Sequence, residues 1–314
     1  MKSTQTQQVR LAYLGALVAV FLWGGNFVII KLAFDFVDPV FLTALRFGLV
    51  ALLLPLTGWC SDVPWRIVGL YALSSCLGQY LLSTLAIALG LSAGIAAFLM
   101  QSQVFFSVGL AYWVMHEPLR ATTVGGCVIG LVGLTFVLLT GSSNATLIGF
   151  AVCLVAAASW SVAGLLVRRH KVQNILQLQT SAAALAFLPA LGCSFAFEAR
   201  HFDAQRIVAD PLLFVGLVLY STLLSFALAQ TLWGRAIKIT GLAAVSPLSM
   251  LVPVLGLALA HFVLGERYNP LLLASVGLVL AGLALHLIPI LRTPQMAAPS
   301  VGSPLMSKPT GATK

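Results

Sequence analysis

A small set of polar and aromatic side chains lies inside long apolar stretches of the sequence, where each polar group needs a partner. One cation, three amides and three aromatic rings make up this set: Arg46, Asn26, Gln79, Gln101, Trp23, Phe105 and Trp160. A guanidinium binds carboxylates through two parallel hydrogen bonds, amides both donate and accept, and aromatic rings pack on apolar or cationic groups. We therefore take these seven as candidate binding residues for a small zwitterionic or anionic molecule.

Arg46 is the most costly of these residues to place in an apolar stretch. It lies seven residues after Pro39, about 10 Å along a helix at 1.5 Å per residue. One interpretation is a cation that attracts a carboxylate of a bound molecule. The other is that its long side chain reaches outward to pair with Asp35 or Asp38. Both alternatives stay open at this point.

The amides and tryptophans have structural alternatives of the same kind. Trp23 and Asn26 share a helix face at the i, i+3 spacing. Gln101 and Gln103 are two residues apart and cannot share a face, so at most one of them lines a central site. We favour Gln101 for that role. For Trp160, helix packing is the more frequent role.

The sequence predicts no catalytic residue, no metal site and no cofactor. No Asp or Glu falls in the middle of an apolar stretch, and the five cysteines are widely scattered rather than closely spaced as metal ligands are. The net charge of +9 comes from basic residues spread between apolar runs, so it does not indicate nucleic-acid binding.

Composition places most of the chain in a lipid bilayer. Of 314 residues, 60% are hydrophobic and 8% are charged, whereas a soluble domain is about 25% charged. A helix needs roughly 20 residues to cross the bilayer core. Apolar runs near that length predict an all-α membrane protein with ten transmembrane helices: 11–34, 39–58, 66–89, 93–114, 121–140, 147–167, 175–197, 211–233, 241–263 and 271–290.

The basic residues predict the orientation, because cytoplasmic loops are enriched in Lys and Arg. With the N-terminus inside, twelve fall on the cytoplasmic side: Lys2, Arg10, Arg66, Arg120, Arg168, Arg169, Lys171, Arg235, Lys238, Arg292, Lys308 and Lys314. Four fall on the other side: Lys31, Arg200, Arg206 and Arg267. We therefore predict a multi-pass protein of the cell (inner) membrane with both termini in the cytoplasm.

The chain also repeats itself. Residues 94–139 resemble residues 241–287, so that Glu117 corresponds to Glu266 and Gly133 to Gly282. Five helices in each copy is an odd number, so the second copy crosses the membrane in the opposite direction. Such inverted repeats are typical of secondary transporters.

This repeat divides the chain into four parts. Residues 1–10 are predicted to be a cytoplasmic N-terminal tail, 11–140 the first five-helix repeat and 147–290 the second. Residues 291–314, with four prolines among Ser, Gly and Thr, are predicted to be a disordered cytoplasmic tail. Glu117 and Glu266 lie in matching loops, where helix capping or stabilisation of the loop is the expected role.

Several short runs resemble the EamA family of the drug/metabolite transporter superfamily. They are Trp23-Gly24-Gly25-Asn26-Phe27 with Lys31, Arg46-Phe47, the run 101–106, the His116-Glu117 loop and the run 247–253. The resemblance spans nearly the whole chain apart from the tails. It is strongest to members that export O-acetylserine, cysteine and related metabolites. One departure is His116, where a glycine usually precedes the loop glutamate.

The resemblance implies ten helices in two inverted repeats and export of amino acids or related small metabolites by alternating access, without enzyme activity. The partners are then a small-molecule substrate and the lipid bilayer. A channel-like pore is the first alternative, and it would need rings of repeated polar residues. An intramembrane enzyme is the second, and it would need a nucleophile–base pair or a metal cluster at membrane depth.

Overall fold

The computed structural model describes residues 2–116, 118–119, 121–139, 147–198, 201–241 and 245–292. Within these ranges there is no strand, and the only bridge is an isolated antiparallel one between Val37 and Phe202. The first half contains α1 (Lys2–Ala33), α2 (Pro39–Ala51), α3 (Leu54–Thr57), α4 (Trp65–Tyr71), η1 (Ala72–Leu81), α5 (Leu82–Ala88), α6 (Ala93–Leu99), η2 (Met100–Ser102), α7 (Gln103–Met115) and α8 (Ala121–Leu139). The second half contains α9 (Leu147–Arg169), α10 (Ile175–Phe197), α11 (Ala204–Ala209), α12 (Pro211–Leu219), η3 (Tyr220–Leu228), α13 (Ala229–Thr240), η4 (Ser246–Met250), α15 (Leu251–Leu264) and α16 (Pro270–Arg292).

Many of these helices have the length and composition of membrane spans. Seven stretches are long and apolar enough: Thr6–Ala33, Pro39–Thr57, Trp65–Ala88, Ala93–Met115, Leu147–Arg169, Ile175–Phe197 and Pro211–Thr240. Three shorter apolar helices are Ala121–Val137, Leu248–Leu264 and Pro270–Leu285. The prediction of an all-α membrane protein with several spans is confirmed.

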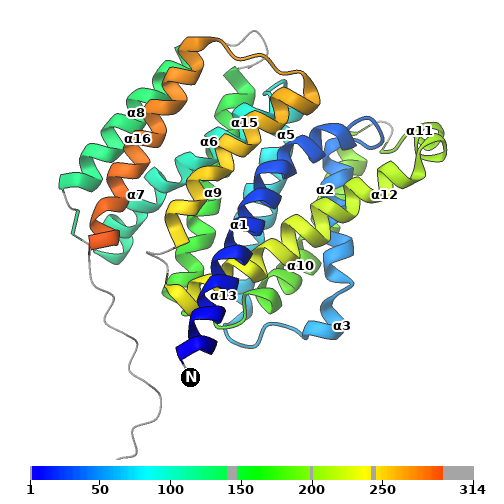
Figure 1. The fold of residues 1–314 in the computed structure, drawn as a ribbon. Coiled ribbons are helices and arrows are strands. Elements are labelled where there is room, and N and C mark those ends of the chain that lie inside the picture. Colours follow the sequence, from blue (N-terminus) through cyan, green and yellow to red (C-terminus); the bar gives the residue numbers. More distant parts are fainter. Residues whose placement is uncertain are drawn as a thin grey trace, which may run out of the picture.

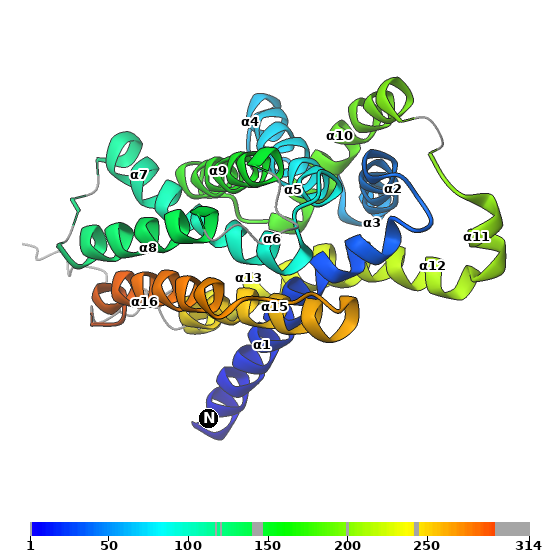
Figure 2. The same cartoon turned by 90° about the horizontal axis from the view of Figure 1, so that it is seen from above.

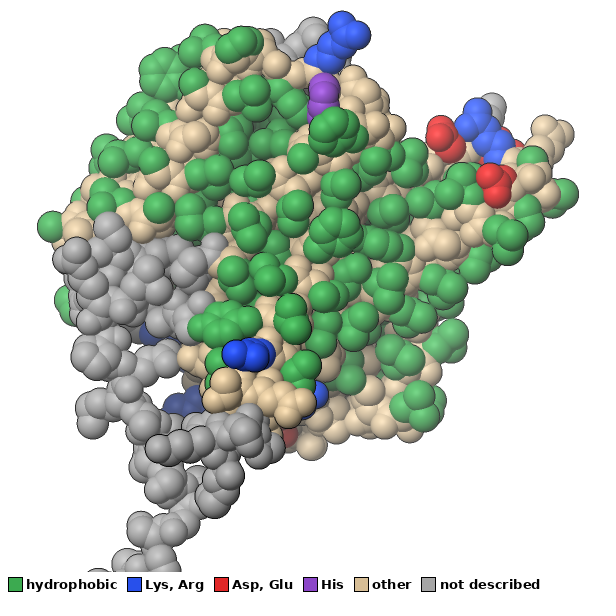
Figure 3. Space-filling model, viewed as in Figure 1, with side chains coloured by type: hydrophobic (Ala, Val, Ile, Leu, Met, Phe, Trp, Pro, Cys, Tyr) green, Lys and Arg blue, Asp and Glu red, His purple; other side chains and the backbone are tan. Residues whose placement is uncertain are grey.

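The surface has the polarity expected of a lipid-embedded protein. Hydrophobic side chains cover most of the face in Figure 3, and charged ones gather near its upper and lower edges. Large apolar side chains such as those of Trp113 and Leu212 are 77% and 86% exposed. Exposed apolar patches of this extent are unfavourable in water. The apolar surface of the molecule therefore fits the hydrocarbon core of a bilayer.

The structure describes the predicted N-terminal tail but not the predicted C-terminal one. Residues 2–10, expected to form a tail, are the first turns of α1. At the other end, α16 continues to Arg292, and the predicted disordered tail beyond it lies outside the described residues.

The helices pack in pairs that join distant parts of the chain. In both views α8 and α16 run side by side at one end of the molecule (Figures 1 and 2). The other extensive contacts are α2 with α10, α1 with α13 and α15, α6 with α15, and α9 with η1 and α7. Each of these pairs joins an element of the first half to an element of the second half.

Four segments depart from α-helical geometry inside the predicted spans. The segments η1 and η3 are π-helical, whereas η2 and η4 are short 3₁₀ helices. Both kinds of turn disrupt the regular i→i−4 ladder and are frequent at functional sites. Hydropathy predicted the spans but not these interruptions.

The helix ends preceding the two matching glutamates have the same cap. His116 ends α7 with φ 55° and ψ 35°, and Gly265 ends α15 with φ 67° and ψ 19°. Each backbone N–H bonds back into its helix, to the carbonyls of Ala111 and Ala260. His116 therefore takes the left-handed conformation that its glycine counterpart adopts at lower cost.

The predicted capping role of Glu266 is confirmed. Its two carboxylate oxygens accept the backbone N–H groups of Ala93 and Gly94, at 2.8 and 3.2 Å, at the start of α6. The Tyr268 hydroxyl donates to the same carboxylate at 2.6 Å. Burial, together with this hydrogen bond and the nearby negative charge, raises the pKa of Tyr268, so the hydroxyl keeps its proton and remains a donor. Glu117 lies outside the described residues.

Candidate functional site

Arg46 lies in the interior of the helix bundle, on α2, with 2% of its surface exposed. Its Nη2 donates to the carbonyl oxygen of Ser221 at 3.2 Å. The other two guanidinium nitrogens, Nε and Nη1, have no hydrogen-bond partner. The guanidinium carbon lies 5.2 Å from the centre of the Tyr80 ring, within the range of a cation–π interaction. Arg46 thus presents a buried positive charge with two unused donor groups.

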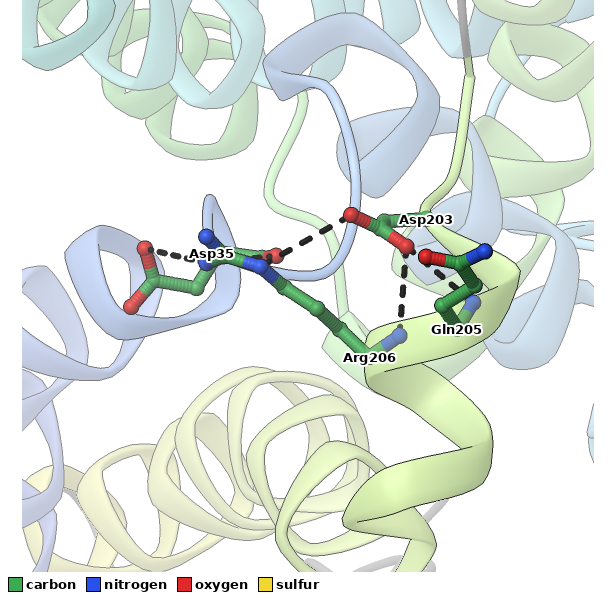
Figure 4. Close-up of polar contacts among 4 residues, drawn as sticks. All are labelled: Asp35, Asp203, Gln205 and Arg206. Carbon is green, nitrogen blue, oxygen red and sulfur yellow. Dashed lines mark hydrogen bonds and ion pairs between the residues drawn. The ribbon is translucent and has the colours of Figure 1, made fainter.

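The alternative in which Arg46 reaches outward to Asp35 or Asp38 is wrong. Asp35 pairs with Arg206 at 3.3 Å, and Asp38 accepts a backbone N–H from the segment before α11. Figure 4 shows Arg206 between Asp35 and Asp203, with Nε 3.7 Å from the Asp203 carboxylate. None of the ion pairs formed within the described ranges includes Arg46.

The Tyr80 ring that faces the guanidinium belongs to a cluster of three aromatic rings. The Tyr80 ring packs edge-on against Trp160 of α9, with centroids 6.4 Å apart, and in a tilted arrangement against Phe226 of η3, with centroids 5.0 Å apart. Trp160 was a predicted candidate, whereas Tyr80 and Phe226 were missed. The available signal for Tyr80 was its position next to the mid-span Gln79, since a buried tyrosine hydroxyl also needs a polar partner.

The π-helical segment η3 receives two of the predicted side chains. Trp23 Nε1 donates to the Ser225 carbonyl at 3.1 Å, one turn along from the Ser221 carbonyl that accepts from Arg46. Turns of π-helix are rare overall and are frequently found at functional sites. The Trp23 ring also packs on Trp233 of α13, at 5.3 Å. Side chains from α1 and α2 therefore meet at one irregular segment of the second half.

Two of the predicted amides have unused acceptors. Asn26 is 7% exposed, and its Oδ1 has no hydrogen-bond partner. The Oε1 atom of Gln79, on η1, is likewise buried without a partner. A buried acceptor left unpaired costs about 1–3 kcal/mol. Both oxygens can therefore still accept a hydrogen bond.

Gln101 and Phe105 make helix contacts instead. Gln101 Nε2 donates to the Ser249 carbonyl in η4 at 2.8 Å, joining the two 3₁₀ segments. The Phe105 ring packs against Gly130 of α8 so closely that an added Cβ would lie 2.1 Å from it. Both residues thus hold helices together, and a binding role for either stays a prediction.

The apolar spans and their buried polar groups define an α-helical membrane protein with several spans. Within the described ranges, no three His, Cys, Asp or Glu side chains lie together as a metal site would require.

The chain belongs to the EamA-like transporter family, which matches residues 10–139 and again residues 143–288. A relative from Salmonella typhimurium, described as a probable amino-acid metabolite efflux pump, is 31% identical over 278 residues, covering 86% of this chain and 93% of its own. Its Escherichia coli namesake is 28% identical over the same shares. A Chlamydia muridarum protein described as an S-adenosylmethionine/S-adenosylhomocysteine transporter is 25% identical over 83% of this chain and 87% of its own.

A solved crystal structure supports the fold. It covers 91% of this chain and 98% of its own, with a TM-score of 0.60 and 19% identity. The family and the relatives are transporters and not enzymes. The predicted family and the predicted absence of enzyme activity are confirmed.

Proposed function

We propose that the chain crosses the membrane ten times, as two inverted five-helix repeats over 11–140 and 147–290. The seven long spans and three shorter apolar helices add up to that number, and the family matches the chain in two consecutive segments. The irregular helices support the same division. The π-helical segments η1 and η3 and the 3₁₀ segments η2 and η4 occupy corresponding places in the two halves.

The packing supports inverted repeats as well. Under this division α2 corresponds to α10 and α8 to α16. Each of these helices contacts its own counterpart. The contact of α1 with η3 and α13 corresponds to that of α9 with η1 and α5. A two-fold relation between the halves accounts for all of these pairs.

We further propose that the protein exports amino acids or related small metabolites, of the O-acetylserine and cysteine type, by alternating access around Arg46. The observation that carries this proposal is a buried guanidinium with two unpaired donors. A substrate carboxylate supplies the acceptors that it lacks. The unpaired oxygens of Asn26 and Gln79 complement the ammonium group of the same substrate. The efflux pumps among the relatives act on molecules of this kind by name.

Export is tested by measuring metabolites that accumulate in the medium of cells with and without the protein. Alanine replacements of Trp23, Asn26, Gln79 and Gln101 should each lower export by about tenfold, the equivalent of about 1.4 kcal/mol, at near-normal membrane abundance. Trp113→Ala is the matched control, since Trp113 is 77% exposed on the apolar surface. Loss of all four variants from the membrane, with normal export per molecule, would support packing roles only.

The proposed orientation has both termini in the cytoplasm of a cell whose inner membrane holds the protein. Reporter fusions after Lys171 and after Lys314 should both give a cytoplasmic signal, because the basic residues concentrate on that side. A fusion within 198–210 should report the opposite side. A cytoplasmic signal from that segment would contradict the inverted repeat.

A further inference from the structure

An acidic side chain at one end of α10 caps the beginning of α2. Glu198 follows α10 directly, and its two carboxylate oxygens accept the backbone N–H groups of Val40 and Phe41, at 2.5 and 2.8 Å. The hydroxyl of Ser194, itself fully buried, donates to the same carboxylate at 2.7 Å. An anion at a helix N-terminus satisfies unpaired N–H groups and the helix dipole together. Glu198 thus ties the second half of the chain to the first.

The backbone around Glu198 strengthens this joint. Asp38 N donates to the His201 carbonyl at 3.1 Å, and Asp203 N donates to the Phe36 carbonyl at 2.8 Å. His201 N in turn donates to the Asp38 carboxylate at 3.2 Å. The segments entering α2 and leaving α10 are therefore bound through both backbone and side chains.

The opposite ends of the same two helices carry a reciprocal joint. Asp62, which follows α2 and α3, accepts the backbone N–H groups of Gln173 and Asn174 at the start of α10, at 3.1 and 2.9 Å. Nearby, the N–H of Cys60 donates to the Ser181 hydroxyl at 2.8 Å. Each acid lies beyond the C-terminus of one helix and caps the N-terminus of the other.

We propose that Glu198 and Asp62 are two opposed latches that hold α2 and α10 together at one face of the membrane or the other. This inference rests on the alternating access proposed above. In that cycle the ends of α2 and α10 part at one face while they stay closed at the other. Weakening one latch shifts the population of molecules toward the state in which α2 and α10 are apart at the end that carries this latch. That state has the two helices closed at the opposite end.

Cys60 is a native reporter of the Asp62 latch, because it is 4% exposed and bonds across the joint. The rate of its reaction with N-ethylmaleimide can be followed by peptide mass spectrometry on the full-length protein in lipid nanodiscs. Asp62→Asn should speed this reaction about tenfold, which corresponds to about 1.4 kcal/mol. Glu198→Gln should slow it, although the substitution lies at the far end of both helices.

The slowing is the diagnostic result, since general loosening of the fold would speed the reaction in every variant. Ser194→Ala removes the hydroxyl that donates to Glu198. It should also slow the reaction of Cys60, by a smaller factor than Glu198→Gln does. The double variant Glu198→Gln/Asp62→Asn should return toward the wild-type rate. Asp210→Asn is the matched control, because Asp210 caps the start of its own helix α12 at the Leu213 N–H.

Faster or unchanged modification of Cys60 in Glu198→Gln and Ser194→Ala would overturn the paired latches. Metabolite export is measured separately, so the two proposals fail in different ways. Export without opposed effects on Cys60 leaves the transport function standing and removes the latches. Opposed effects without export of any amino-acid metabolite leave the latches standing and remove the proposed substrate.

Discussion

Replacing Arg46 by glutamine should abolish export of carboxylate-bearing metabolites while the protein remains folded in the membrane. Removing one member of a buried, hydrogen-bonded charge pair costs about 2–5 kcal/mol, so transport should fall by at least about 30-fold. Arg46→Lys keeps the charge but loses the planar arrangement of donors, and should retain partial activity. Export is measured as substrate appearing outside the cells per molecule of membrane protein.

The stability of the same variant separates a binding role from a structural one. A buried guanidinium with two unpaired nitrogens carries a desolvation cost that no acid of the described ranges offsets through an ion pair. Arg46→Gln should therefore leave the thermal midpoint of the purified protein unchanged or raise it. A guanidinium that only stabilised the bundle would give the opposite result, with a lower midpoint and normal export per folded molecule.

Lys31→Gln is the matched control for the loss of one positive charge. Lys31 is exposed near the end of α1, with its ammonium 5.8 Å from the Phe34 ring, so its charge does not lie in the interior of the bundle. Its replacement should leave export near normal. Wild-type export by a well-folded Arg46→Gln protein would remove Arg46 from the site.

The apolar spans and the match between the two loops could be predicted from sequence, because both depend on patterns along the chain. Apolar length predicted the helices, and the 149-residue correspondence paired the loop of Glu117 with that of Glu266. The same spacing relates His116 to Gly265, which the structure shows to have equivalent left-handed caps. His116 thus takes the same left-handed backbone conformation as Gly265 in the matching loop.

The site could be predicted only in part, because its contacts join residues far apart in sequence. Arg46 bonds to Ser221, 175 residues away, and Trp23 bonds to Ser225, 202 residues away. Both acceptors lie in the π-helical segment η3, and no residue pattern in that apolar run marks the change from an α-helix. From the sequence, an ion pair of Arg46 with Asp35 or Asp38 and a buried binding role were equally plausible. The sequence does not show which residues lie opposite Arg46 across the helix bundle.

The substitution Gly282→Leu should prevent stable folding of the protein. Gly282 of α16 lies directly on α8, where an added Cβ would be 2.5 Å from the Gly126 carbonyl oxygen and 2.7 Å from the Gly130 nitrogen. Both are backbone atoms and cannot rotate away as a side chain could. Overpacking a well-packed contact costs about 1–3 kcal/mol and occasionally more, and the larger cost applies where two helix backbones must separate. Membrane abundance and the thermal midpoint should both fall sharply.

Gly277→Leu supplies the control on the same helix. An added Cβ at Gly277 has no atom within 4 Å, and the position is exposed on the apolar surface, so a leucine there meets lipid and should be tolerated. The pair therefore separates close helix contact from any general effect of leucine on α16. Membrane helices gain little from apolar burial, because lipid is as apolar as leucine, and they depend on small residues for close packing. Equal abundance of the two leucine variants would show that α8 and α16 do not need this close approach.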